Sequence, residues 1–164
     1  MNIRLFRFFN RLVKATPSCI RKWFYIKNGL KIGNGTTFSS DCMIDNPNNI
    51  NIGEESYINR FCQFHTGMSE NATICIGSRT WIGCNVSFIC ITHEKGDSFK
   101  RAGKNLYGSI NIGNGNWIGA NSIILPNVKI GNGVIIGAGS IVTRNCKDNC
   151  LYAGNPVKMI KKLQ

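Results

Sequence analysis

The sequence predicts an all-β fold, a parallel β-helix, and two features of a six-residue repeat carry this prediction. An apolar residue opens each of fifteen six-residue rungs, and eight of these openers are followed at once by glycine. The fifth position of a rung is usually small or thin, as in Thr36, Cys42 and Ser56. The openers are Ile32, Phe38, Ile44, Ile52, Ile58, Phe64, Ile76, Ile82, Phe88, Ile112, Ile118, Ile124, Ile130, Ile136 and Val142. A hexapeptide period is typical of parallel β-helices, in which each rung buries its apolar residue by stacking on its neighbours.

The rungs group in threes, and three rungs make one triangular coil. The coils span residues 32–49, 52–69, 76–93, 112–129 and 130–147, so we expect five of them. Stacked at roughly 4.8 Å per strand layer, they would form a prism about 24 Å tall. Right-handed parallel crossovers are the general rule, and the period alone does not decide the hand of this helix.

The intervals between the coils differ in length. Two residues separate the first two coils, six residues (70–75) separate the next two, and none separates the last two. The longest interval, residues 94–111, lies between His93 and Ile112. A long loop on a rigid repeat scaffold is more often functional than accidental, so we expect an extruded functional loop at 94–111.

The N-terminal arm, residues 1–31, departs from the repeat and predicts two short helices. It carries eight basic side chains and no acidic one. In residues 2–14, Leu and Phe side chains cover one helical face. The basic residues on the other face are Arg4, Arg7, Arg11 and Lys14. Such a helix suits an anionic membrane surface, or it caps the open end of the prism as terminal repeats require; both roles can hold at once.

The second helix of the arm is predicted from its end signals. Thr16 should cap it, with Pro17 in its first turn. Asn28 and Gly29 should end it. We expect no membrane-spanning segment and no signal peptide, and we expect residues 148–164 to form a helical tail.

Charge and cysteine content exclude several classes of protein. The net charge is +12, but residues 32–145 contain eight basic and seven acidic side chains, so a uniformly basic nucleic-acid-binding surface is not expected. Of the eight cysteines, Cys42, Cys62 and Cys146 occupy small fifth positions, and no CxxC pair occurs. We therefore expect buried free thiols in a reducing cytoplasm rather than a disulfide framework or a zinc site.

His93 is the strongest candidate for a catalytic residue. It closes the third coil, where the loop 94–111 leaves the prism, and histidine exchanges protons readily near neutral pH. The other histidine, His65, directly follows a rung opener and is expected to be ordinary. Two histidines cannot provide the three-histidine zinc site of a hydratase on this kind of prism, so we expect a single base and no metal.

Several motifs together point to one family. They are Thr92-His93, the loop motifs Gly96-Asp97 and Arg101-Ala102-Gly103, the run INIGNGNWIGANSIILPNVKIGNGVIIGAGSIVT and the segment LYAGNPVKMIKKL. Residues 52–163 thereby resemble the left-handed β-helix O-acetyltransferases of the galactoside and maltose acetyltransferase group, and are closest to their short relatives in surface-polysaccharide gene clusters. The resemblance implies a left-handed parallel β-helix, acetyl-CoA as the donor, a homotrimer, and active sites in the clefts between neighbouring prisms.

The resemblance also implies roles for particular residues. His93 matches the family's general base, and Asn59 matches an asparagine that contacts the acceptor. Trp117 matches an aromatic that lines the CoA cleft, although it could instead lie at a trimer contact. The remaining matches are Ala120, Ala138 and Thr143, beside the pantetheine arm, and Lys158 and Lys161, near the CoA phosphates. The two lysines could also belong to a solvated helix face.

Two departures from the family bear on the acceptor. The basic arm replaces the N-terminal helical segment that supplies an acidic residue in the galactoside and maltose enzymes, and Gly67 stands at the place of a second acceptor-side aspartate. Free galactosides and maltose are therefore not expected as acceptors. The leading hypothesis is a cytoplasmic O-acetyltransferase that modifies a sugar hydroxyl of a surface polysaccharide or its precursor. The alternatives are N-acetylation of an amino-sugar nucleotide and a non-catalytic β-helix binding protein.

Overall fold

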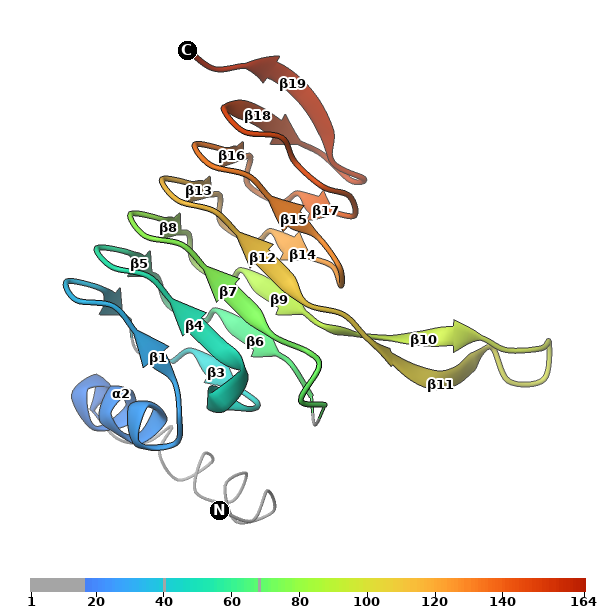
Figure 1. The fold of residues 1–164 in the computed structure, drawn as a ribbon. Coiled ribbons are helices and arrows are strands. Elements are labelled where there is room, and N and C mark those ends of the chain that lie inside the picture. The colour runs from blue at the N-terminus through green and yellow to red at the C-terminus, as the bar shows by residue number, and fades with distance from the viewer. Residues whose placement is uncertain (1–16, 40, 68) are drawn as a thin grey trace.

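The computed structural model describes residues 17–39, 41–67 and 69–164, and within them the chain winds into a parallel β-helix (Figure 1). Short strands form three sheets, which we name A, B and C, one for each side of the triangular coil; their strands are parallel apart from the last strand of sheet B. The strand orders are β1-β4-β7-β12-β15 in sheet A, β19-β18-β16-β13-β8-β5-β2 in sheet B and β17-β14-β9-β6-β3 in sheet C. Equivalent rungs pair in register, so Ile52 lies beside Ile76 and Ile76 beside Ile112. The predicted all-β parallel fold is confirmed.

The strands are two to six residues long, and most of them begin just before a rung opener. Sheet A contains β1 (Lys31–Ile32), β4 (Ile50–Ile52), β7 (Ile74–Ile76), β12 (Ile110–Ile112) and β15 (Lys129–Ile130). Sheet B contains β2 (Thr37–Phe38), β5 (Tyr57–Ile58), β8 (Trp81–Ile82), β13 (Trp117–Ile118), β16 (Ile135–Ile136), β18 (Cys150–Ala153) and β19 (Lys158–Lys162). Sheet C contains β3 (Met43–Ile44), β6 (Gln63–His65), β9 (Ser87–Ile89), β14 (Ile123–Ile124) and β17 (Ile141–Val142). A 3-10 turn (Pro47–Asn49) precedes β4. The chain runs from A to B to C, and we name the connecting turns the A–B, B–C and C–A corners.

The rung openers form the core, as predicted. All of them are buried except Ile32, which is half-buried and packs against the others. Three aromatic openers of successive coils stack, with ring centroids 6.0 Å apart for Phe38 and Phe64 and 4.9 Å apart for Phe64 and Phe88. Such contacts add to the burial of apolar area, so each coil is stabilised mainly by its neighbours.

Small polar residues at the fifth position of a rung link neighbouring coils. The hydroxyl of Thr36 donates to the carbonyl of Gly53 at 2.6 Å, and the hydroxyl of Ser56 donates to the carbonyl of Gly77 at 3.0 Å. These hydroxyls are buried, and a buried polar group needs such a partner. The preference for small residues at this position therefore reflects both a tight corner and a repeated hydrogen bond.

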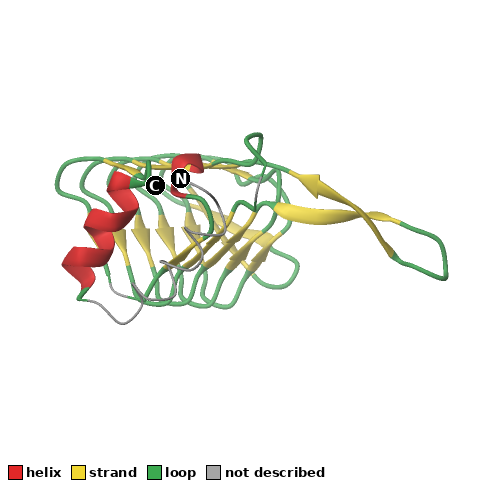
Figure 2. Ribbon diagram, turned by 90° about the horizontal axis from the view of Figure 1, so that it is seen from below, coloured by secondary structure: helices red, strands yellow, loops and turns green. Residues whose placement is uncertain are grey.

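Helix α2 (Ser18–Lys27) lies across the N-terminal end of the prism (Figures 1 and 2). It ends at Asn28 and Gly29, as predicted, and Gly29 has a φ of +98°, which glycine adopts without strain. Its start was predicted wrongly: Pro17 is the N-cap residue and not part of the first turn, and no side chain of the described residues caps the helix. Thr16 and the predicted helix at 2–14 lie outside the described residues. No helix in the described part of the chain is long and apolar enough to cross a membrane.

The long insertion is a β-hairpin and begins earlier than predicted. Strands β10 (Ile91–Lys95) and β11 (Ala102–Tyr107) pair antiparallel and project from the prism (Figure 1). Cys90 is the last buried residue before the hairpin, and Thr92, at the fifth position of the rung that Phe88 opens, is exposed. Asp97 holds the tip, because its Oδ1 accepts hydrogen bonds from the backbone N–H groups of Phe99 and Lys100, both at 3.0 Å.

The predicted helical tail is wrong, because the C-terminal segment is a second hairpin. Strand β18 adds to the edge of β16 in sheet B, and β19 then pairs antiparallel with β18. The edge of β16 offers unpaired backbone groups, which β18 satisfies while burying Cys150 and Tyr152. Strand pairing at the edge of sheet B therefore outweighs the helical pattern in the sequence of this segment.

Candidate active site

His93 lies on β10 with one ring nitrogen held, and no described residue engages the other. Its Nδ1 is 3.3 Å from the carbonyl oxygen of Gly103 on β11. A carbonyl can only accept, so this contact requires a proton on Nδ1 and leaves Nε2 of a neutral ring with a lone pair. The side chain is exposed. The hairpin thus presents His93 in the tautomer that a general base needs.

Two polar residues of β11 lie beside His93, and sequence reasoning missed both. Asn105 is the cross-strand partner of His93, and Tyr107 is the partner of Ile91, so all four side chains share one face of the hairpin. The Asn105 amide donates to the Tyr107 hydroxyl at 3.3 Å. No pattern in the sequence identifies them, because only the antiparallel pairing of 91–95 with 102–107 brings them beside His93.

The base of the hairpin covers the position of Gly67. Gly67 is buried with a φ of +66°, and a side chain there would meet Ile91 and Tyr107. A side chain at this position would therefore require the Ile91 side chain to move and would adopt a left-handed backbone conformation.

His65 differs from His93 because both of its ring nitrogens have protein partners. Its Nδ1 lies 3.4 Å from Asp45 Oδ2, and its Nε2 lies 3.0 Å from Gln63 Oε1. All three side chains are half-buried on sheet C. This histidine lacks the free nitrogen that proton transfer requires.

An apolar ladder runs along the outer face of sheet B. Trp117 pairs with Trp81 on one side and with Ile135 on the other, and Ile135 pairs with Leu151. Trp81 and Trp117 are 62% and 59% exposed, which is unusual for large apolar side chains in neighbouring strands. Trp117 therefore forms part of a surface suited to a partner or a ligand.

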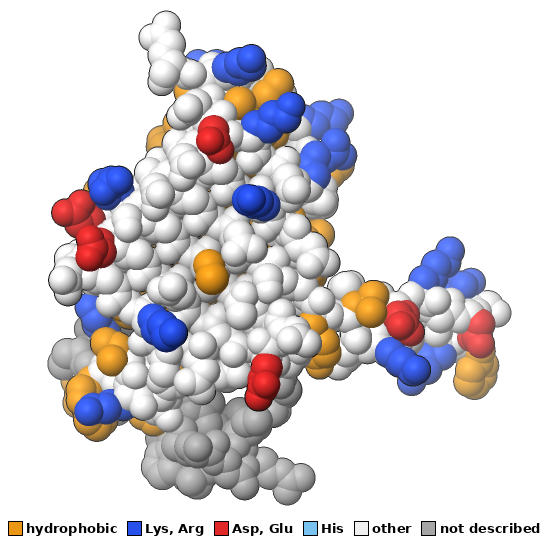
Figure 3. Space-filling view, in the orientation of Figure 1, with side chains coloured by type: hydrophobic (Ala, Val, Ile, Leu, Met, Phe, Trp, Pro, Cys, Tyr) orange, Lys and Arg blue, Asp and Glu red, His pale blue; other side chains and the backbone are white. Residues whose placement is uncertain are grey.

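Lys158 and Lys161 lie on the same face of sheet B as Trp117. Lys161 pairs with Leu151 and Lys158 pairs with Ala153, whereas Lys162 pairs with buried Cys150. A bulge between Leu151 and Tyr152 allows the two lysines, three residues apart, to share one face of a strand. Figure 3 shows basic side chains gathered at this C-terminal end of the prism and along the projecting hairpin.

Ala120 and Ala138 stack at the B–C corner. A Cβ on Gly119 would lie 2.5 Å from the backbone nitrogen of Ala138, so the backbones of these coils approach closely. Ala138 is exposed and Ala120 is half-exposed. The corner is therefore a narrow, small-residue edge next to the ladder of sheet B.

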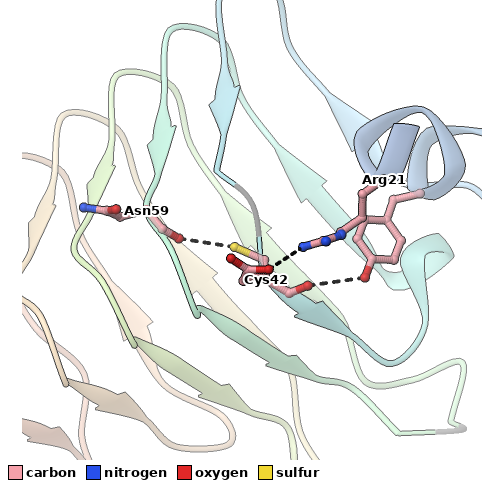
Figure 4. Close-up of polar contacts among 5 residues, drawn as sticks. Arg21, Cys42 and Asn59 are labelled. Atoms are coloured by element: carbon pink, nitrogen blue, oxygen red, sulfur yellow. Dashed lines mark hydrogen bonds and ion pairs between the residues drawn. The ribbon is translucent and has the colours of Figure 1, made fainter. Parts of the chain in front are cut away.

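Asn59 lies at the same B–C corner, two coils nearer the N-terminus. Its Oδ1 accepts from the backbone N–H of Arg60 at 2.7 Å, and among the described residues no partner engages its Nδ2. The Cys42 thiol donates to the Asn59 backbone carbonyl at 3.2 Å, and the Asn59 side chain points away from Cys42 (Figure 4). The amide NH₂ of Asn59 is thus a free donor on a fixed backbone.

The candidate residues therefore form two groups on opposite edges of sheet C. Asn59, Ala120 and Ala138 lie at the B–C corner, beside Trp117 and the two lysines on sheet B. Thr143, which is exposed, follows β17 at the C–A corner, and the hairpin with His93 leaves from that corner after β9. One chain does not bring the two groups together.

The cysteines of the described residues do not form a metal-binding site. The seven described cysteines are free, and no three His, Cys, Asp or Glu side chains there could hold a metal ion. A side-chain hydrogen bond with Cys62 and burial raise the pKa of the Cys42 thiol. Burial raises the pKa of Cys90 to about 12 and that of Cys146 to about 11. These thiols are packing residues that stay protonated.

Comparison with known proteins gives the family of this hexapeptide-repeat prism. Residues 109–144 match the bacterial transferase hexapeptide family (six repeats). A relative from Dictyostelium discoideum, named an acetyltransferase, is 38% identical over 157 residues, which cover 96% of this chain and 78% of the relative.

Two solved structures are similar over almost the whole chain. A maltose O-acetyltransferase from Clostridium difficile 630 has a TM-score of 0.77 and 29% identity, covering 96% of this chain and 84% of that one. A galactoside acetyltransferase in complex with coenzyme A has a TM-score of 0.83 and 26% identity, covering 99% and 82%. The chain belongs to the hexapeptide-repeat acetyltransferases and is an acyltransferase.

Proposed function

We propose that the protein transfers an acetyl group from acetyl-CoA to a hydroxyl of a sugar in a surface polysaccharide or its precursor, with His93 as the general base. The observation that carries this proposal is the Nδ1 contact of His93 with the Gly103 carbonyl, which leaves Nε2 free on an exposed hairpin. A sugar hydroxyl is a weak nucleophile, and a base within about 2.6–3.2 Å of it supplies the missing reactivity.

The proposed proton path uses atoms of this chain. His93 Nε2 takes the hydroxyl proton while the sugar oxygen forms a bond to the thioester carbonyl carbon. The carbon–sulfur bond then breaks, the sugar ester remains, and the imidazolium returns its proton to the CoA sulfur. Fixed donors stabilise the negative charge that develops on the carbonyl oxygen. The free Nδ2 of Asn59 is such a donor, and it also suits an acceptor hydroxyl.

The proposed CoA seat is the edge between sheet B and the B–C corner. Trp117 offers an exposed flat surface, and Ala120 and Ala138 let a thin pantetheine arm approach the backbone. Thr143 would join this site from the C–A edge. Lys158 and Lys161 stand on the same sheet face as Trp117, where ammonium groups suit phosphates. The galactoside acetyltransferase with a similar fold was solved with coenzyme A.

We infer that the working form is a homotrimer with left-handed prisms and that its active sites lie between copies. His93 and Ala138 lie on opposite edges of sheet C, so the C–A edge of one copy must face the B–C edge of the next to complete a site. Outward apolar side chains support such contacts. These are Trp81, Ile89, Ile123, Leu125, Ile135 and Ile141.

The acceptor proposal rests on the relatives and on Gly67. The two structures compared above are enzymes named for galactoside and maltose, and Gly67 stands at the place of an acceptor-side aspartate, so we do not expect a free small sugar as the acceptor. We place the reaction in the cytoplasm, near the inner membrane surface through the basic residues 2–14. N-acetylation of an amino-sugar nucleotide is the alternative.

The test is a thiol-release assay with acetyl-CoA and a panel of glycan, sugar and amino-sugar nucleotide acceptors. His93→Ala should lower turnover by about 10²–10⁴-fold without changing the thermal shift that CoA produces. His65→Ala is the matched control and should keep its activity. An equal loss in both variants, or a His93→Ala variant with more than about a third of normal turnover, would show that the base is misassigned. Turnover only with amino sugars would favour N-acetylation.

A further inference from the structure

Helix α2 has an inner face that ties it firmly to the prism. Arg21 is 3% exposed, and its guanidinium lies 3.1 Å from Asp41 Oδ1. Tyr25 is fully buried, and its hydroxyl donates to the Cys42 carbonyl at 3.3 Å (Figure 4). Burial raises the pKa of Tyr25 to about 12, so this hydroxyl stays a donor. The helix is thus a rigid cap, and its outer face has a fixed orientation.

The outer face of α2 is apolar and large. Ile20, Trp23 and Ile26 are 47%, 60% and 45% exposed. With about 100° between successive helix residues, these three side chains lie within roughly 120° of arc, opposite Arg21 and Tyr25. An exposed apolar patch of this kind usually contacts another molecule.

The surroundings of this apolar stripe are basic. Lys27 and Lys31 are exposed, and the segment 17–31 contains four basic side chains and no acidic one. Because Asp41 offsets the charge of Arg21, the net positive charge of segment 17–31 comes from its three lysines. Figure 3 shows hydrophobic and basic side chains next to each other at this end of the molecule. Trp and Ile flanked by Lys is the pattern of a helix that lies in a membrane interface.

We propose that the outer face of α2 docks on an anionic lipid bilayer, with Ile20, Trp23 and Ile26 entering the headgroup region and Lys27 and Lys31 contacting lipid phosphates. Each cation near such a surface adds about 1 kcal/mol, which is about fivefold in partitioning. The apolar side chains add burial that a zwitterionic surface also offers. The docking site belongs to the folded cap, and it is distinct from residues 2–14.

A trimer would strengthen this docking. Rotation about a threefold axis keeps equivalent atoms at one height, so three α2 helices would face the same side, and linked weak contacts bind far more tightly than one. This step rests on the proposed trimer, whereas docking of one helix does not. Measuring vesicle binding without substrate separates the inference from the proposed activity.

The experiment is co-sedimentation of the full chain with vesicles of phosphatidylcholine alone and with added phosphatidylglycerol. We expect binding to the anionic vesicles, weakening as salt rises. The triple variant Ile20→Ser, Trp23→Ser, Ile26→Ser should bind at least about tenfold more weakly. Phe99→Ala removes an aromatic that is 99% exposed on the hairpin tip and is the matched control, which should bind normally.

The thermal midpoint of each variant shows whether it is folded, and a second variant guards against a misfolded triple. Lys27→Glu with Lys31→Glu changes only exposed charges and should abolish the preference for anionic vesicles. Normal binding by the triple variant and by the charge variant would overturn the inference and assign any binding to residues 1–16. Loss of trimerisation instead of vesicle binding would show that the face contacts another copy, and a loss confined to Phe99→Ala would place the membrane contact on the hairpin.

Discussion

Mixed trimers of two inactive variants should regain activity, because each active site is proposed to take one edge from each of two copies. His93→Ala disables the C–A edge. Ala138→Trp fills the B–C corner, where Ala138 is exposed and a Cβ added to the next residue, Gly139, would meet no atom of another residue within 4 Å. Both changes lie on the surface, so neither should lower the free energy of unfolding by more than about 0.5 kcal/mol. Each variant alone should retain under about one hundredth of normal turnover.

The expected recovery of activity follows from the closed ring that the three copies form. Each site joins the His93 edge of one copy to the Ala138 edge of the next, and a closed heterologous ring of three has three such junctions. Whether a mixed trimer contains one or two copies of a given variant, only one junction joins two intact edges. Its turnover should therefore be about one third of the normal value.

The assay needs two affinity tags, one on each variant, and successive purification on both. Thiol release is then measured per mole of trimer. The control carries both tags on His93→Ala chains and should stay inactive. Mixed trimers that are no more active than the better single variant would refute the shared site and place all catalytic groups within one chain.

Three further predictions concern the tail, the core and the thiols. Lys158→Ala with Lys161→Ala should weaken the binding of CoA more than that of dephospho-CoA, by under about 1 kcal/mol per lysine. Lys162→Ala, on the other strand face, should not have this effect. Calorimetric titration with both ligands measures the two affinities. Phe64→Ala should lower the free energy of unfolding by about 3–5 kcal/mol, measured in urea, since Phe64 is fully buried between two stacked rings. Stability should fall as pH rises from 9.0 toward about 12, because the unfolded Cys90 thiol ionises first; the fall is up to about 1.4 kcal/mol per pH unit for one thiol, and Cys90→Ala should reduce it in pH-dependent melts.

The six-residue period predicted the prism because this fold buries one apolar residue in every six-residue rung. Every opener from Phe38 onward is buried, and the small fifth positions lie where corner hydroxyls donate to the next coil. The signal is strong because an error of one residue within a rung would turn its apolar opener outward. Local propensity contributed little, since most strands are only two or three residues long.

The two hairpins were missed because their pairing depends on tertiary context. The segment 158–162 has a helical spacing of basic residues, yet it forms β19 because β18 first occupies the edge of β16 and leaves an edge of its own. The 94–111 interval has no marked alternation, and its strands are specified by their partners across the turn at Asp97. Asn105 and Tyr107 could not be recognised as neighbours of His93 without that pairing.

The division of the site between two edges follows from the position of each residue within its coil. Residues at one rung position of successive coils stack in a column, so the opener that a residue follows decides its corner. Asn59 and Ala138 follow openers of sheet B, and Thr143 and the hairpin follow openers of sheet C. No change of side-chain rotamer moves a residue from one corner to the other. A prism of this kind can therefore join a base on one edge to a CoA seat on the other only by placing two copies side by side, which makes assembly a condition of the proposed chemistry.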